Sequence, residues 1–185
     1  MNFLIGVLAA SVTTFAATNI DDIFLLTLFF ANRVPTKRII TGQYLGFAAI
    51  IILSLIGVWA ALAIPQKWIR LLGLLPLAIG VKQLLSGRKR SPTERAPQND
   101  YGVLSLAIIT LSNGSDNVGV YVPFFVAGLR YLWLILTIYL LLLAFWCFAG
   151  WWLGSHPIVL RGAQRWGHWA VPVVFIVLGA YVLLR

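Results

Sequence analysis

The sequence predicts an all-α polytopic membrane protein whose six transmembrane helices form two inverted three-helix repeats. Of the 185 residues, 61% are hydrophobic and only 10% are charged, whereas about a quarter of the residues in a soluble domain carry a charge. Six long apolar stretches fill nearly the whole chain, and one polar motif occurs in both halves. This composition excludes a disordered chain, a disulfide-rich secreted domain and an ordinary cytosolic enzyme.

The six apolar stretches are long enough to cross a bilayer, which takes about 20 mainly apolar residues. We place them at 3–31, 39–63, 68–85, 103–129, 131–153 and 169–184. They are continuous runs and not short alternating segments, which favours helices over barrel strands. No basic segment precedes the first stretch, so we interpret it as a retained helix and not as a signal peptide.

Two of these helices differ in their expected continuity. The fourth contains Gly114 and Pro123, and proline removes an interior helix hydrogen bond, so we expect a break close to the polar motif. The first has no glycine or proline between Gly6 and Pro35, and we expect it to run unbroken.

A polar linker divides the chain into a first three-helix repeat at 1–85, a cytoplasmic segment at 86–102 and a second repeat at 103–185. The formal net charge is +9. In a membrane protein this excess indicates loops that face anionic lipid, so we expect the lipid bilayer as partner and no nucleic acid. Ten Lys and Arg residues follow the first, third and fifth helices and four lie on the other side, which puts both termini outside.

The motif that both halves share reads hydroxyl-Asn-x-x-Asp. It is TNIDD at 18–22 in the first helix and SNGSDN at 112–117 in the fourth. Residues three apart lie on one helical face, so each motif presents amide and carboxylate oxygens in one direction. An odd number of helices per half puts the two copies in opposite orientations, as in the inverted repeats of secondary transporters.

Three of the five acidic residues lie inside apolar spans, where each costs about 2.5–3.5 kcal/mol. Carboxylate and amide oxygens around a midplane cavity suit a divalent cation, and no Lys or Arg lies at that depth to bind an anion. The candidate metal ligands are Asn19, Asp21, Asp22, Asn113, Asp116 and Asn117.

Four other polar residues are candidates for the substrate path: Thr18, Ser112, Ser115 and Gln43. Gln43 stands beside Gly42 and Gly46, whose spacing is typical of closely packed helices. The alternative for all these polar groups is that they only join helices by hydrogen bonds, as membrane Asn often does.

The same segments resemble the cadmium resistance transporter family, a branch of the lysine exporter superfamily. The matching pieces are TNIDD (18–22), GQYLGF (42–47), LLGLLPLAIGVKQLL (71–85), SNGSDNVGVYVPFF (112–125) and VLGAYVLL (177–184). The resemblance implies a small six-helix protein of the prokaryotic inner membrane that confers resistance by exporting a cation. It also implies that the six candidate ligands lie near the substrate path.

The metal itself is left open between cadmium, manganese, calcium and zinc. Cadmium is a soft ion that prefers thiolate, but the only thiol is Cys147, on the fifth helix and away from both motifs. An all-oxygen site is better matched to hard cations.

We therefore expect a secondary exporter of a divalent metal cation that is coupled to protons and holds no cofactor. No phosphate-binding G-x-x-x-x-G-K-[ST] loop is present to supply energy from a nucleotide. The alternatives are an exporter of an organic cation or amino acid, and a membrane protein that sequesters metal without flux. We do not expect an enzyme, because G-x-G-D and H-E-x-x-H motifs are absent. A homo-oligomer is left open.

Overall fold

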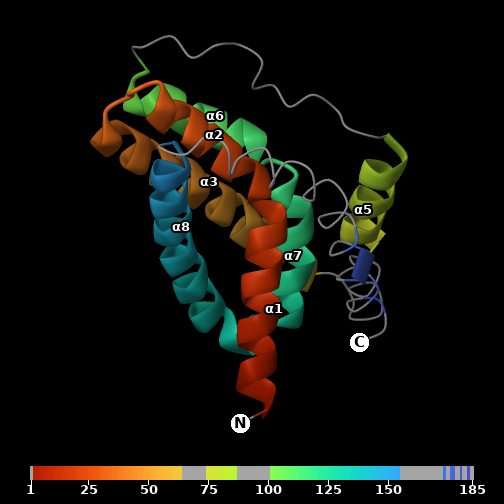
Figure 1. Cartoon of the computed structure of the whole chain (residues 1–185). Helices are drawn as coiled ribbons and strands as arrows, with labels where there is room; N and C mark the ends of the chain where they lie inside the picture. Colours follow the sequence, from red (N-terminus) through yellow and green to blue (C-terminus); the bar gives the residue numbers. More distant parts are fainter. Residues whose placement is uncertain are drawn as a thin grey trace.

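The described part of the chain is entirely helical. The computed structural model describes residues 2–63, 74–86 and 101–154, with single positions at 173, 176, 177, 180 and 183, and none of them forms a strand. The elements in order are α1 (Asn2–Thr18), α2 (Ile20–Ala31), α3 (Thr36–Leu62), α5 (Leu74–Ser86), α6 (Val103–Asn113), α7 (Asn117–Ala127), the 3-10 turn η3 (Leu129–Tyr131) and α8 (Leu132–Gly154) (Figure 1). The all-α prediction is confirmed for these residues.

Two of the described helices are long and apolar enough to cross a membrane alone: α3, and α8 with its preceding turn. If the bent pair of α1 and α2 is counted as one span, the described residues contain three. Helices α6 and α7 have 11 residues each, about 16 Å apiece, against a hydrocarbon core of about 30 Å. Apart from the five single positions, the predicted span at 169–184 lies outside the described residues, as does most of the linker at 86–102.

The expectation of an unbroken first helix is wrong. Its two parts, α1 and α2, meet at Asn19 with a bend of 56°. The expected break in the fourth helix is confirmed, because α6 ends at Asn113 and α7 begins at Asn117 after a three-residue turn. Both copies of the motif therefore lie at helix breaks.

The turn between α2 and α3 has a Schellman geometry. The Val34 N–H donates to the Phe29 carbonyl at 3.1 Å, and the Arg33 N–H donates to the Phe30 carbonyl at 3.0 Å, which closes the helix end in the expected 6→1 and 5→2 pattern. Arg33 takes a left-handed φ of 57°, and Val34 and Phe29 are both buried in one apolar cluster. The turn fixes where α2 ends and α3 starts.

Glycines allow two helix pairs to pack at very short distance. A Cβ added to Gly46 on α3 would lie 2.6 Å from Thr110 Cβ on α6, and one added to Gly42 would lie 2.5 Å from Leu106 Cβ. The predicted close-packing role of Gly42 and Gly46 is thus confirmed. On α8, a Cβ at Gly150 would lie 2.6 Å from Leu26 Cβ of α2.

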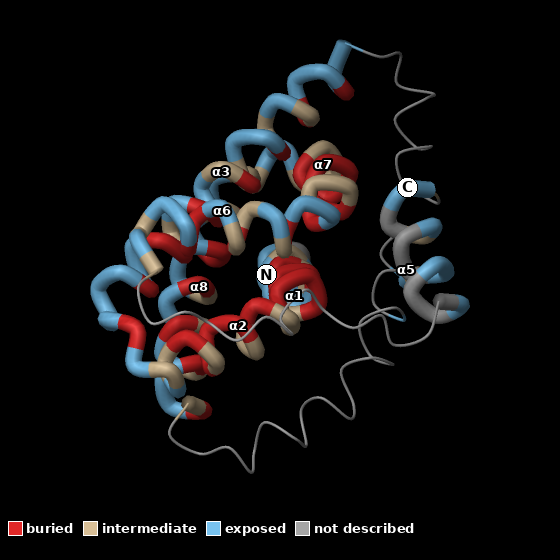
Figure 2. The backbone as a smooth tube through the Cα atoms, turned by 90° about the horizontal axis from the view of Figure 1, so that it is seen from above, coloured by how far each residue is buried: buried red, intermediate tan, exposed pale blue. Residues whose placement is uncertain are grey.

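Aromatic side chains from four helices fill the core. The ring of Phe15 on α1 lies 5.6 Å from that of Phe47 on α3 and 5.3 Å from that of Tyr139 on α8. Tyr121 on α7 stands 5.1 Å from Tyr139, measured between ring centroids. Figure 2 shows buried residues gathered along α1, α2 and α7, and two of these helices, α1 and α7, contribute to this cluster together with α3 and α8.

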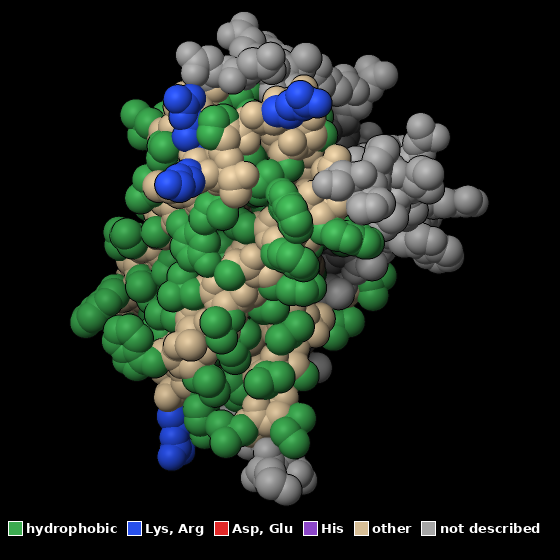
Figure 3. Space-filling model, turned by 60° about the vertical axis from the view of Figure 1, so that its left-hand side comes forward, with side chains coloured by type: hydrophobic (Ala, Val, Ile, Leu, Met, Phe, Trp, Pro, Cys, Tyr) green, Lys and Arg blue, Asp and Glu red, His purple; other side chains and the backbone are tan. Residues whose placement is uncertain are grey.

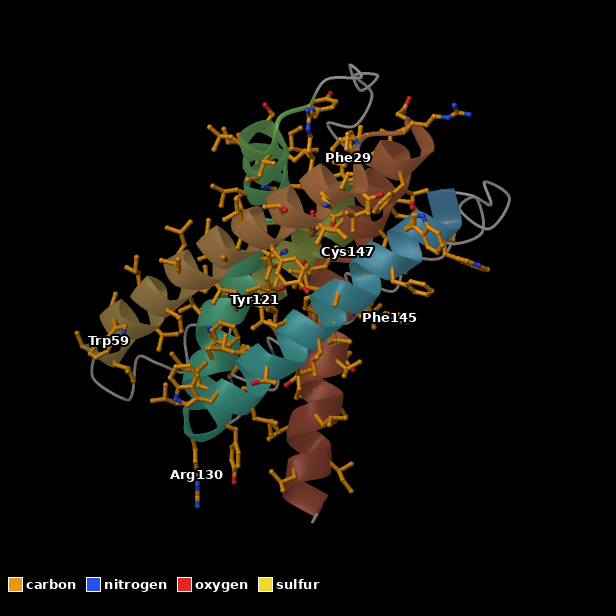
Figure 4. All side chains as sticks on the ribbon, turned by 90° about the vertical axis from the view of Figure 1, so that its left-hand side faces the viewer. Phe29, Trp59, Tyr121, Arg130, Phe145 and Cys147 are labelled. Carbon is orange, nitrogen blue, oxygen red and sulfur yellow. The ribbon has the colours of Figure 1, made fainter. Side chains whose placement is uncertain are left out.

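One face of the molecule is apolar between two basic ends. Figure 3 shows hydrophobic side chains over the middle of one face, Lys and Arg at both ends and no acidic side chain. Large apolar side chains are also exposed on α8, where Trp133 and Leu141 are 84% and 67% exposed. Figure 4 places Arg130 at the opposite end of the molecule from Phe29. An apolar belt between charged ends is the surface that a bilayer requires.

Candidate functional site

The carboxylate of Asp22 is where the two motifs meet. Asp22 lies in the first turn of α2 and is 1% exposed. Its Oδ1 accepts a hydrogen bond from Asn113 Nδ2 at 2.8 Å, and its Oδ2 accepts one from Gln43 Nε2 at 3.1 Å. Asn113 ends α6 and Gln43 lies on α3, so three helices converge on one buried carboxylate.

Thr110 extends this network by one further bond. Its Oγ1 donates to Gln43 Oε1 at 2.8 Å, and both side chains are buried. Thr110 and Asn113 are three residues apart on α6 and share a face. The close approach of Gly46 to Thr110 brings α3 near enough to α6 for Gln43 to reach both Thr110 and Asp22. We call Thr110, Gln43, Asp22 and Asn113 the Asp22 network.

A second network surrounds Asn19 at the bend between α1 and α2. Asn19 Nδ2 lies 2.8 Å from each of three acceptors, the Phe15 carbonyl, Thr18 Oγ1 and Tyr121 Oη. Its two protons are therefore shared among three acceptors. Thr18 Oγ1 and Tyr121 Oη are also 2.8 Å apart, and Trp146 Nε1 donates to the Asn19 carbonyl at 2.7 Å. We call these the Asn19 network.

The Asn19 network explains why the helix bends without glycine or proline. The Phe15 carbonyl accepts the Asn19 side-chain amide in addition to the Asn19 backbone N–H at 3.0 Å, and the indole of Trp146 takes the Asn19 carbonyl. Side chains that replace backbone partners are a recognised cause of helix kinks. Asn19 Oδ1 is buried and has no hydrogen-bond partner among the described residues.

The other predicted residues lie around these two networks and differ in burial. Asp21 is half-buried, and its Oδ1 accepts the Asp22 N–H at 3.1 Å. Asp116 is exposed at the start of α7, and its charge lies within electrostatic range of both Asp21 and Asp22. Asn117 is buried, and its Nδ2 has no partner among the described residues.

Two serines complete the turn between α6 and α7. Ser112 and Ser115 are exposed, and Ser115 Oγ donates to the Ser112 carbonyl at 3.1 Å. Among the described side chains, the hydrogen bonds of Asp22 lead to Asn113 and Gln43 and not to Asp116. The structure thus joins the two motifs through a carboxylate and an amide.

The chemistry of the site is that of amides, hydroxyls and one central carboxylate. Within residues 2–63, 74–86 and 101–154, no three His, Cys, Asp or Glu side chains come together as a metal-binding group. The Cys147 thiol is free and buried on α8. Cys147 also lines an apolar cavity of about 290 Å³ between α2, α3 and α8, and Figure 4 shows it in the middle of the molecule.

Sequence reasoning missed three residues of these networks: Thr110, Tyr121 and Trp146. Tyr121 follows Asn117 by four positions on α7, so its place on the same helical face was a usable signal. Thr110 precedes Asn113 by three positions and carries the same signal on α6. Trp146 is on the long apolar helix α8, and nothing in its sequence neighbourhood marks it.

Comparison with known proteins settles the family. A family model described as cadmium resistance transporter matches residues 15–185. The chain belongs to the cadmium resistance transporter family. No curated protein and no solved structure matches the chain.

Membership in the cadmium resistance transporter family agrees with the apolar helices in assigning this chain to membrane transport. The match begins at Phe15 and so includes both copies of the motif. The expected resemblance to this family is confirmed, and the wider link to the lysine exporter superfamily stays a prediction.

Proposed function

We propose that this member of the cadmium resistance transporter family is a secondary transporter that exports a divalent metal cation across the prokaryotic inner membrane, coupled to protons. The observation that carries the proposal is the burial of Asp22 between polar groups of three helices. Ionisable residues inside membrane spans are costly, and those that are kept mark ion or substrate pathways.

In this proposal Asp22 is the central ligand of the cation. The amide oxygens of Asn19 and Asn113 are the next ligands, and the buried Asn19 oxygen without a donor supports such a role. Oxygen donors of this kind match calcium or manganese, and cadmium, which is close to calcium in size, fits the same donors. Asn117 is kept as a further ligand because its side chain is buried at the start of α7, next to Asp116.

In the proposal, Asp21 and Asp116 are two carboxylates that a cation reaches more easily than the buried Asp22. Asp116 is exposed beside the Ser112–Ser115 turn, so it meets a cation before or after Asp22 does. One of the three aspartates exchanges a proton as the site changes sides. Thr18, Ser112, Ser115 and Gln43 line the path, and the chain acts without a cofactor and not as an enzyme.

For the architecture we propose six spans arranged as two inverted repeats, 1–85 and 103–185, with both termini outside. The paired helix breaks support this, because α1–α2 and α6–α7 are each interrupted at the same motif. Broken helices that meet at a midplane site are a hallmark of secondary transporters built from inverted repeats. In this arrangement α6 and α7 together make one span.

The test is metal flux into proteoliposomes that contain the full chain, with cadmium, manganese, calcium and zinc in parallel. We expect Asp22→Asn to abolish flux of the preferred metal and the proton movement that accompanies it. Ser54→Ala is the matched control, because Ser54 is a buried polar residue that bonds only its own helix, at the Ile50 carbonyl. Unchanged antiport in Asp22→Asn contradicts the proposal.

The same vesicles separate the alternatives. Saturable metal binding without flux in the wild-type chain indicates sequestration, and competition of metal flux by lysine or choline indicates an organic substrate. Either result replaces the proposed function.

A further inference from the structure

The hydrogen bonds around Asp22 present amide hydrogens to the carboxylate and not amide oxygens. Gln43 donates through Nε2 and Asn113 through Nδ2. An ionised carboxylate only accepts, so the orientation of both amides follows from the chemistry of Asp22. A cation bound at Asp22 demands the reverse, because it is coordinated by amide oxygens and repelled by N–H groups.

Gln43 is the amide with the more constrained surroundings. It is 3% exposed, and its oxygen is held by Thr110 Oγ1 at 2.8 Å. Turning its side chain over moves Oε1 toward Asp22 and Nε2 toward Thr110. The helices need not move for this, because the glycine contacts hold α3 against α6 on either side of Gln43.

Thr110 is suited to hold either orientation. A threonine hydroxyl has one donor and two acceptor sites, so it donates to Gln43 Oε1 in the observed arrangement and accepts from Nε2 in the reversed one. Its proton then turns to the carbonyl one turn earlier in α6, the bond that buried membrane threonines commonly make. A group that only donates or only accepts serves one orientation alone.

We propose that Gln43 and Thr110 form an amide switch at Asp22, in which Gln43 donates a hydrogen bond to the carboxylate through its NH₂ group and turns over to coordinate a cation through its oxygen. Gln43 is the ligand that turns, and Thr110 is the positioning residue that keeps both orientations bonded. The inference rests on the proposed function, since it concerns the same cation site. Through this switch, Asp22 stays buried and bonded throughout the transport cycle.

The test compares Thr110→Val, which keeps the shape but removes the hydroxyl, with Thr110→Ser, which keeps the hydroxyl. We measure cadmium and manganese binding to the purified full chain by titration calorimetry and initial rates of export. Thr110→Val is expected to weaken metal binding at least tenfold, the size of effect that residues behind metal ligands have, while Thr110→Ser stays within threefold of wild type.

Thr27→Val is the matched control. Thr27 is equally buried, on α2, and its hydroxyl bonds only the Ile23 carbonyl at 2.6 Å. We expect its metal affinity to match wild type. An equal loss of affinity in Thr27→Val and Thr110→Val shows a general structural effect and overturns the switch.

A second measurement covers the case in which Thr110→Val does not fold. Infrared difference spectra recorded with and without metal should contain a side-chain amide carbonyl band in the wild type. We expect Gln43→Met to fold and to lack this band. A spectrum that is the same with and without Gln43 overturns the switch. If Asp22→Asn leaves metal binding unchanged, the proposed function itself fails. If Asp22→Asn weakens metal binding but Thr110→Val does not, only the switch fails.

Discussion

The two helix breaks differ in what causes them. The break between α6 and α7 is local, because Gly114 begins a three-residue turn whose Ser115 and Asp116 side chains are exposed. The break at Asn19 has no turn residue, and it is made by partners that come from elsewhere in the chain, Tyr121 and Trp146. One motif therefore lies in an exposed turn, and the other lies at a bend that is held by buried side chains.

The first way to test this difference is to remove the buried amide. Asn19→Ala deletes the donor that serves the Phe15 carbonyl, Thr18 and Tyr121. A hydrogen bond contributes about 1 kcal/mol net, and one buried amide makes three of them here, so we expect the largest loss for this variant, about 3 kcal/mol in unfolding free energy in detergent, together with loss of export. A loss smaller than that of Gly114→Ala reverses the comparison.

The second test fills the space at the local break. A Cβ at Gly114 would lie 2.5 Å from Ile50 Cδ1, and overpacking of this kind costs about 1–3 kcal/mol. We expect Gly114→Ala to lower the unfolding free energy by about 2 kcal/mol. Ile50→Val removes the atom that clashes, so the double variant should regain much of the loss in the same denaturation assay; strictly additive losses contradict the contact.

The third test removes one acceptor from the packed bend. Tyr121→Phe deletes a hydroxyl that bonds Thr18 and Asn19, but Asn19 keeps two other acceptors. We therefore expect a loss of only about 1 kcal/mol, measured as a shift in the denaturation midpoint. A loss as large as that of Asn19→Ala means that the bend depends on the tyrosine and not on the asparagine.

The smallest effect is expected at the exposed turn. Ser115 is exposed and donates only to the Ser112 carbonyl, so Ser115→Ala should change the unfolding free energy by less than about 0.5 kcal/mol. Metal flux tells whether its hydroxyl belongs to the path: an unchanged rate removes Ser115 from the proposed path, and a lowered rate with unchanged stability keeps it there.

The features that the sequence predicts correctly are those that depend on neighbouring residues in the chain. The apolar runs predict helices, Gly114 predicts the second break, and the glycines around Gln43 predict the close contact of α3 with another helix. All three depend on residues near each other in the chain. The convergence of the two motifs on one buried carboxylate also follows from the sequence, because polar groups in apolar spans face inward.

The missed features are tertiary. The bend at Asn19 depends on a tyrosine and a tryptophan more than 100 residues further along the chain, and no local pattern encodes them. Asp22 bonds directly to Asn113 and Gln43 and not to Asp116, the acidic residue of the second motif. Two carboxylates repel each other, whereas an amide donor satisfies a carboxylate.

Glycine contacts also decide which helices stay together. Gly150 joins α8 to α2, and Gly42 and Gly46 join α3 to α6, while α1 packs on α8 and α7 on α3. The chain thus contains two interlocked blocks, each assembled from early and late helices, and the bonds from Asp22 to Gln43 and Asn113 cross the seam between them. Sliding of one block along the other would stretch those two bonds while the contacts of Gly42, Gly46 and Gly150 stay closed, so Asp22, the cation ligand of the proposed function, links the two blocks.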